Sequence, residues 1–498
     1  MNREIGLRRM PLRLPIPALR TVPVSRREAD LWVVVPSCLL GLVFILRMAR
    51  HLPLLPMPTG DSPAYLDMAG YRPPLYGWLV NAWQYLTGGL EYLPMMQLIL
   101  LGAAVVAFAI ELGRLLRSPL VPVLAIPVVL LHAAIYDSSR WLLTESTFVA
   151  LTLLGLAVQL RYARRGDLVA LLVAAGCFGL STLLRSTGAA FLPLPLLAAL
   201  FDRRFGLRPA MLQAALAAVV AGGVLLSGMS WTYIRHGHFE LGSWAGISLL
   251  GKSLVLLRPE DAVNQPKAVQ AVVPAAADAR RLITAQPDIA ARLRAQVQAS
   301  GDVRFPQFWR IAGREWPEWI AADGRGKDQL ARAIDRALIS AHPGEYLRMW
   351  ANDWLALVLH PSYWPAWATT VAADFDAFPF CRELETCWGL ERYDLPLHGL
   401  LNLLGTSVAG TLLGFVLIPA LAWPVLRRRA SPAVVLMWGI ALVLHASLLV
   451  TSAIEAGHIR YTVALHVLDV TMLVWALMRC LPAGLRSVVQ YGEAEARA

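Results

Sequence analysis

The chain has 498 residues, of which 57% are hydrophobic and only 16% are charged, whereas soluble domains carry about 25% charged residues. This composition argues against an ordinary soluble domain. The net charge of +11 would suit a nucleic-acid partner in a soluble protein, but here the Arg residues cluster in loops between apolar runs. We therefore expect no nucleic acid and attribute the charge to membrane orientation.

Ten apolar runs predict transmembrane helices, because a helix needs about 20 residues to cross a bilayer. They lie at roughly 30–47, 92–112, 119–136, 142–160, 167–184, 187–201, 209–231, 400–425, 432–452 and 461–478. The sequence therefore predicts an all-α polytopic protein embedded in a lipid bilayer. We divide it into an N-terminal membrane module (1–231), an extracytoplasmic helical cap (232–399) and C-terminal membrane helices with a tail (400–498).

The basic residues mark one side of these spans. They crowd the N-terminal tail and alternate loops, at 114–117, 161–165, 203–208 and 427–429. By the positive-inside rule this side is cytoplasmic, so both termini are cytoplasmic and the intervening loops face outward. The basic N-terminal region is too long for a cleavable signal peptide. Because Arg greatly outnumbers Lys, as in GC-rich genomes, we expect a bacterial cytoplasmic (inner) membrane.

The first outer loop, about 48–91, contains the most informative stretch, which reads TGDSPAYLDMAGYRPPLYGWL from Thr59. It holds Asp61 and Arg72 near a membrane boundary, where charges are costly unless they face water, a partner or a substrate. The two prolines that follow Arg72 fix a turn before an apolar helix. We take Asp61 and Arg72 as the leading functional residues, with Tyr65 as a supporting residue.

Three further polar groups are predicted at the same membrane level. They are Asp137 with Arg140 and Glu145, then Arg185 between two abutting spans, and finally His458 with Arg460 and Tyr461. A carboxylate can take a proton from an attacking hydroxyl, and a guanidinium can clamp a phosphate. Plainer alternatives stay open: Glu145 could pair with Arg140 or Arg185, and Asp137 with Arg140.

The cap carries two local features. Residues 346–360 are rich in Trp and too short to cross a bilayer, which predicts an interfacial helix. Cys381 and Cys387 lie close together in the outer segment, and an oxidising compartment favours a disulfide between them.

Four motifs share an order and a predicted side of the membrane. They are GDSPAY at 60–65 with RPPLYGWL at 72–79, LLTESTF at 142–148, GLSTLLRSTG at 179–188 and HIRYTVAL at 458–465. Together they resemble the GT-C superfamily of polyprenyl-phosphate-sugar glycosyltransferases, in the branch of protein mannosyltransferases and bacterial lipid A aminoarabinose transferases. The resemblance implies a GT-C-like fold. It also implies transfer of a sugar from a polyprenyl-phosphate donor to a hydroxyl of a glycan, lipid or protein acceptor, with inversion.

The resemblance also implies roles for individual residues. Asp61 would be the general base, Arg72 would bind the donor phosphate, and Arg185 and Arg460 would lie near it. Two positions depart from the family pattern: Ser62 follows Asp61 where many relatives have a second acid, and Tyr71 stands where some relatives have an acid that helps to hold a metal. We therefore assign no cofactor from the sequence, and a divalent metal stays an open alternative.

Two rival functions stay open. A lipid or glycan transporter or flippase would also place charges within a membrane protein, although here they gather at one face rather than at the midplane. A non-catalytic subunit that binds lipid would use the same surfaces. The chain lacks the H-E-x-x-H, P-loop and G-x-S-x-G motifs, so the sequence gives no support to a zinc protease, a nucleotide-driven pump or a serine hydrolase.

Overall fold

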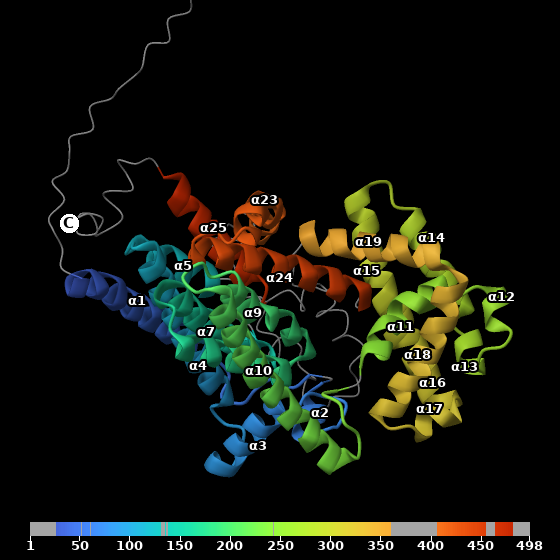
Figure 1. The fold of residues 1–498 in the computed structure, drawn as a ribbon. Coiled ribbons are helices and arrows are strands. Elements are labelled where there is room, and N and C mark those ends of the chain that lie inside the picture. The colour runs from blue at the N-terminus through green and yellow to red at the C-terminus, as the bar shows by residue number, and fades with distance from the viewer. Residues whose placement is uncertain are drawn as a thin grey trace, which may run out of the picture.

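A computed structural model of the chain describes residues 26–50, 52–59, 61–130, 135, 138–242, 244–359, 406–454 and 464–481. Within these ranges the regular structure is helical and contains no strand. Figure 1 shows a bundle of long helices beside a separate group of shorter ones. The predicted all-α class is therefore confirmed for the described residues.

Six described helices are long and apolar enough to cross a membrane, by length and composition. They are Asp30–Ala49 of α1 (Arg26–Ala49), α4 (Leu93–Leu116), α7 (Glu145–Arg165), α10 (Leu207–His236), Val408–Leu426 of α23 (Thr406–Leu426) and α24 (Pro432–Ile454). Each overlaps a predicted span, which supports a helical membrane protein.

The other four predicted spans correspond to shorter described helices. These are α5 (Leu120–Leu130), α8 (Leu168–Leu184), the 3₁₀ helix η1 (Ser186–Phe191) with α9 (Pro193–Leu200), and α25 (His466–Cys480). The 17 residues of α8 extend about 25 Å at 1.5 Å per residue, which falls short of a hydrocarbon core of about 30 Å. A total of ten crossings therefore stays a prediction.

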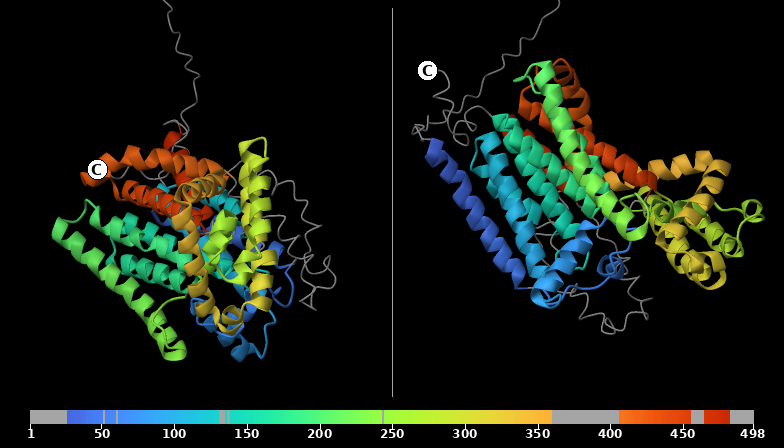
Figure 2. Two further views of the ribbon diagram at one scale, coloured as in Figure 1. Left: turned by 90° about the vertical axis from the view of Figure 1, so that its right-hand side faces the viewer. Right: turned by 60° about the horizontal axis from the view of Figure 1, so that its bottom comes forward.

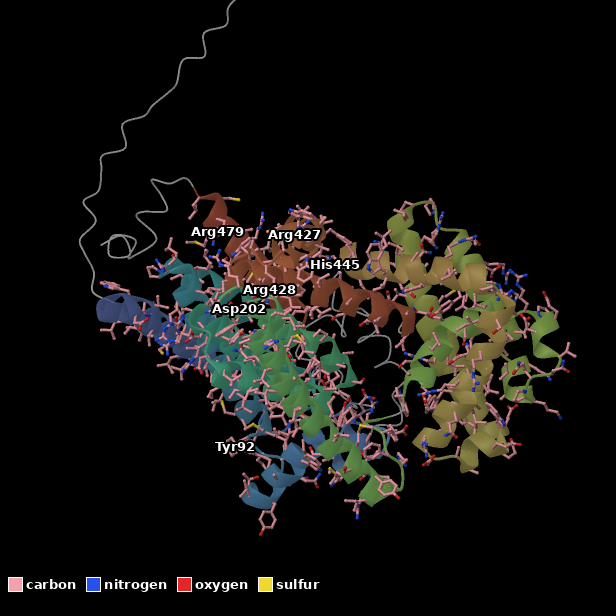
Figure 3. The ribbon with its side chains drawn as sticks, viewed as in Figure 1. Tyr92, Asp202, Arg427, Arg428, His445 and Arg479 are labelled. Atoms are coloured by element: carbon pink, nitrogen blue, oxygen red, sulfur yellow. The ribbon has the colours of Figure 1, made fainter. Side chains whose placement is uncertain are left out.

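The basic loops that we placed on one side do lie together at one end of the bundle. Arg164, at the end of α7, donates to Glu111 of α4 at 2.9 Å. Arg428, after α23, donates to the carbonyl of Asp202 at 2.9 Å. Figure 3 shows Arg428 and Asp202 together, whereas Tyr92, which precedes α4, lies at the opposite end. The helices therefore run between a basic end and an end that carries the predicted site.

Helix α7 occupies the centre of the bundle and packs against α4 and α8. Of its most apolar 18-residue stretch 78% is buried, the largest share among the six long apolar helices. On α4 the buried side chains recur at Leu98, Leu101, Val105 and Phe108, the spacing of one helix face. Because α7 is held on several sides, its first residue, Glu145, has a fixed position.

The cap begins after α10, which is followed by Gly237, whose φ of 77° lies in the left-handed region that favours glycine. Its helices are α11 (Ala245–Leu256), α12 (Pro259–Ala262), α13 (Lys267–Gln270), α14 (Val273–Thr284), α15 (Ile289–Asp302), the π-helix η2 (Val303–Trp309), α16 (Arg310–Glu315), α17 (Pro317–Ala321), α18 (Gly324–Ala341) and α19 (Pro343–Leu359). They enclose their own apolar core, which includes Leu254, Phe308 and Trp319. Figure 2 shows the cap projecting from the end of the bundle.

The helix predicted over 346–360 is present as α19, which packs on the end of α24. Tyr346 donates from Oη to the carbonyl of Ala453 at 2.7 Å, and Trp350 donates from Nε1 to that of Leu449 at 3.0 Å. These bonds fix the cap to the non-basic end of the bundle. Cys381 and Cys387 lie outside the described residues, and their disulfide stays a prediction.

Candidate functional site

The first outer loop turns back on itself and brings Asp61 against Arg72. Asp61 precedes α2 (Ser62–Leu66), and Arg72 precedes the two prolines that lead into α3 (Leu75–Thr87). The backbone N–H of Arg72 donates to the carbonyl of Ala69 at 3.0 Å and closes a turn. Nη2 of Arg72 then lies 2.5 Å from Oδ1 of Asp61, and the exposed fractions of the two side chains are 18% and 25%. The two leading sequence candidates therefore form one ion pair.

Three aromatic rings surround the guanidinium of Arg72. Its central carbon lies 5.7 Å from the ring centroids of Tyr65 and Tyr71, and 5.1 Å from that of Trp244. Such cation–π contacts hold a guanidinium by electrostatic attraction to the ring faces. Tyr71 and Trp244 stack on each other with centroids 4.6 Å apart. Because Trp244 immediately precedes α11, the cap reaches the predicted phosphate-binding residue.

Tyr71 is clamped between the bundle and the cap. A Cβ on Gly242 would lie 2.9 Å from the carbonyl oxygen of Tyr71, and one on Gly324 would overlap its ring. Only glycine permits these approaches. Burial also raises the pKa of Tyr71, so its phenol stays neutral.

The segment before α7 is bonded to this loop. The N–H of Met57 donates to the carbonyl of Arg140 at 2.8 Å, and the N–H of Leu142 donates to the carbonyl of Met57 at 2.9 Å. Oγ of Ser62 donates to the carbonyl of Leu142 at 3.0 Å. The loop that carries Asp61 and the segment that leads to Glu145 are therefore one connected unit.

Glu145 and Arg185 form a second ion pair. Oε1 of Glu145 lies 2.7 Å from Nη1 of Arg185, with exposed fractions of 3% and 12%. Glu145 occupies the first turn of α7, where the helix dipole favours a negative charge. Arg185 stands in an extended conformation where α8 ends and η1 begins. Of the alternatives raised by the sequence, the pairing of Glu145 with Arg185 is therefore present.

Gln97 of α4 belongs to the site region but was missed by the sequence analysis. Its fully buried side chain donates from Nε2 to the carbonyls of Ser139 and Trp141, at 3.1 and 3.2 Å, and accepts from Oη of Tyr76 at 3.1 Å. It thus ties α3 and α4 to the segment before Glu145. A Gln inside an apolar run is the signal that could have revealed it.

The remaining predicted residues divide into two groups. Arg140 is described and buried, at 5% exposure, and belongs to the segment bonded to the first loop. Asp137, His458, Arg460 and Tyr461 lie outside the described residues. Their roles at the site stay predictions.

The described residues include no group of three or more His, Cys, Asp or Glu side chains that could hold a metal ion. A small pocket beside the Asp61–Arg72 pair is lined by Tyr65, Met68, Arg72 and Trp231, among others. Its volume is about 10 Å³, the space of about one water molecule. A ligand the size of a phosphate therefore enters this pocket only if the neighbouring side chains move.

No protein-family model matches the chain, and no curated protein or solved structure matches it.

Proposed function

We propose that the chain is an integral membrane glycosyltransferase that moves a sugar from a polyprenyl-phosphate donor to an acceptor hydroxyl on the extracytoplasmic face. One observation carries this proposal: two carboxylate–guanidinium pairs, Asp61–Arg72 and Glu145–Arg185, lie on bonded segments at the non-basic end of the bundle. The pairs combine a candidate proton acceptor with groups that bind phosphate.

The proposed reaction is a direct displacement. The acceptor oxygen attacks the anomeric carbon of the sugar, and Asp61 takes the hydroxyl proton. The bond between the anomeric carbon and the phosphate oxygen breaks, and its electron pair leaves with the polyprenyl phosphate. Arg72 stabilises this leaving group, with Arg185 and Arg460 as further candidates. One displacement inverts the anomeric configuration.

The surroundings of the site favour a lipid-carried donor. By the positive-inside rule the basic end of the bundle faces the cytoplasm, so the site faces outward, away from cytoplasmic sugar nucleotides. A polyprenyl chain would reach the pairs from the bilayer, and the acceptor would arrive from the aqueous side beneath the cap. A GT-C-like arrangement in a bacterial inner membrane, with Asp137, Arg140, Tyr65, His458 and Tyr461 in supporting roles, belongs to this proposal.

One observation favours the alternative of a transporter or flippase. Asp469 of α25 is buried, at 2% exposure, and accepts from Oγ1 of Thr411 on α23 at 3.3 Å. Ionisable groups buried among membrane helices are rare and often mark transport paths. The two ion pairs at the end of the bundle favour the transferase, because a path across the membrane would place charges near its midplane.

The test is transfer of radiolabel from a panel of polyprenyl-phosphate sugars to membrane acceptors, with the purified protein and its Asp61→Asn variant. Label transferred by the wild type alone would support the proposal and name the donor. Asp67→Asn is the matched control, since it removes one charge from the same loop outside the pair. Equal transfer by wild type and Asp61→Asn would remove Asp61 from the chemistry. Movement of labelled lipid across vesicles without transfer would favour the transporter.

A further inference from the structure

The two residues that the proposed reaction assigns to different substrates are bonded to each other. Asp61 would receive the acceptor proton and Arg72 would hold the donor phosphate, yet Oδ1 and Nη2 of the pair lie 2.5 Å apart. A carboxylate against a guanidinium is a weaker base, because the neighbouring positive charge favours its ionised form. In this structure each group therefore restrains the other.

The space beside Arg72 is small. The adjacent pocket holds about 10 Å³, too little for a phosphate group, and the side chains of Arg72 and Asp61 are 18% and 25% exposed. A phosphate that binds Nη2 of Arg72 must compete with the carboxylate already there. Phosphate is a strong competitor, since it presents several oxygens to the guanidinium fork.

The guanidinium is held from other directions, whichever anion it binds. Tyr65 comes from α2, Tyr71 from the loop and Trp244 from the junction with the cap. These rings position the cation without neutralising its charge. Arg72 can therefore exchange one anionic partner for another while it keeps its place.

We propose that the Asp61–Arg72 pair is a donor-operated switch, in which the donor phosphate displaces Asp61 from Arg72 and only then leaves the carboxylate able to act as a base. This inference rests on the proposed function and adds an order of events to it: the donor binds before the acceptor is activated. With this order of events, the acceptor hydroxyl is deprotonated only when the donor site is occupied.

The switch makes a specific prediction about binding alone. In the Asp61→Asn variant, a neutral amide replaces the carboxylate that competes with the donor phosphate for Arg72. The variant should therefore bind the donor phosphate more tightly than the wild type. The probe is a polyprenyl monophosphate without sugar, titrated into the full-length protein in lipid nanodiscs. We expect the dissociation constant to fall about tenfold, which is about 1.4 kcal/mol, because a hydrogen bond between charged groups is stronger than one to a neutral amide.

Matched variants separate the switch from a general change of charge. Asp67→Asn removes a carboxylate from the same loop, where Asp67 ends α2, and should leave the dissociation constant unchanged. Arg72→Gln should weaken binding, and in that background the further change Asp61→Asn should no longer alter the dissociation constant. If Asp61→Asn fails to fold, Asp61→Ser allows the same comparison.

The outcomes distinguish the switch from the proposed function. Tighter binding by Asp61→Asn than by both the wild type and Asp67→Asn would support the switch. Equal or weaker binding by Asp61→Asn would overturn it while leaving transfer by the wild type to stand on its own assay. If the wild type and Asp61→Asn both fail to bind polyprenyl phosphate, the switch and the proposed donor are both wrong.

Discussion

Lys252 and Asp353 form an ion pair that is withdrawn from water, with Nζ 2.7 Å from Oδ2 and exposed fractions of 0% and 1%. Lys252 belongs to α11 and Asp353 to α19, so the pair joins two helices of the cap. Lys252 also donates to the carbonyl of Ser452 in the last turn of α24, where helix carbonyls lack intrahelical donors. The cap therefore satisfies a terminal carbonyl of a bundle helix as well as contacting Arg72 through Trp244.

Lys252→Met should destabilise the attachment of the cap. It leaves the carboxylate of Asp353 buried without its cation, which costs about 3–5 kcal/mol. In the double variant Lys252→Met/Asp353→Leu both charges are replaced by apolar groups, and most of the loss should be recovered. Thermal unfolding of the three proteins, followed by Trp fluorescence, measures both effects. A double variant no more stable than Lys252→Met would show that the stranded charge is not the cause.

Asp335 of α18 should make the stability of the cap depend on pH. It is buried, at 2% exposure, and accepts from Oγ of Ser253 at 2.5 Å. Burial raises the pKa of Asp335 from 3.8 to about 8. The folded cap thus keeps a proton that the unfolded chain releases near pH 3.8. Its contribution to stability is full below that pH and is lost as the pH rises toward about 8.

Asp335→Asn removes this titration while keeping an oxygen for Ser253 to donate to. At pH about 8 the variant should be more stable than the wild type by a few kcal/mol, since each unit of pKa shift is about 1.4 kcal/mol. Near pH 4 the difference should shrink. Midpoints of thermal unfolding across this range provide the measurement. Parallel pH profiles for the two proteins would contradict the role of Asp335.

The sequence predicted local features better than distant contacts. Long apolar runs predicted the helices, and Asp61 and Arg72 are only eleven residues apart, so their proximity followed from one restrained loop. Trp244 and Gln97 were not foreseen. Their partners depend on how α3, α4 and the cap are packed, which no local pattern encodes. The same holds for Lys252, because composition does not distinguish a buried charge from a solvated one.

Gln97→Leu should weaken both the fold and the site. It removes the acceptor for Tyr76 and two donations to the backbone before Glu145, and each buried group left without a partner costs about 1–3 kcal/mol. Tyr76→Phe is the milder control, because it removes one of these bonds. We expect Gln97→Leu to lose transfer activity even at temperatures where circular dichroism shows it folded. Full activity in that variant would show that the segment before Glu145 is positioned by other contacts.

Gly324→Ala should separate the cap from the first outer loop. The added Cβ would overlap the ring of Tyr71, and this ring is already stacked on Trp244. Relief of the overlap must move the cap or the aromatic cage around Arg72, and overpacking of this kind costs about 1–3 kcal/mol.

Gly313→Ala is the matched control for that change. Gly313 also lies in a cap helix, but a Cβ there meets nothing within 4 Å, and Ala is favoured over Gly in helices by up to about 1 kcal/mol. Gly324→Ala should therefore lower the unfolding midpoint and weaken polyprenyl-phosphate binding severalfold, whereas Gly313→Ala should do neither. Equal binding by the two variants would mean that the cap does not position Arg72.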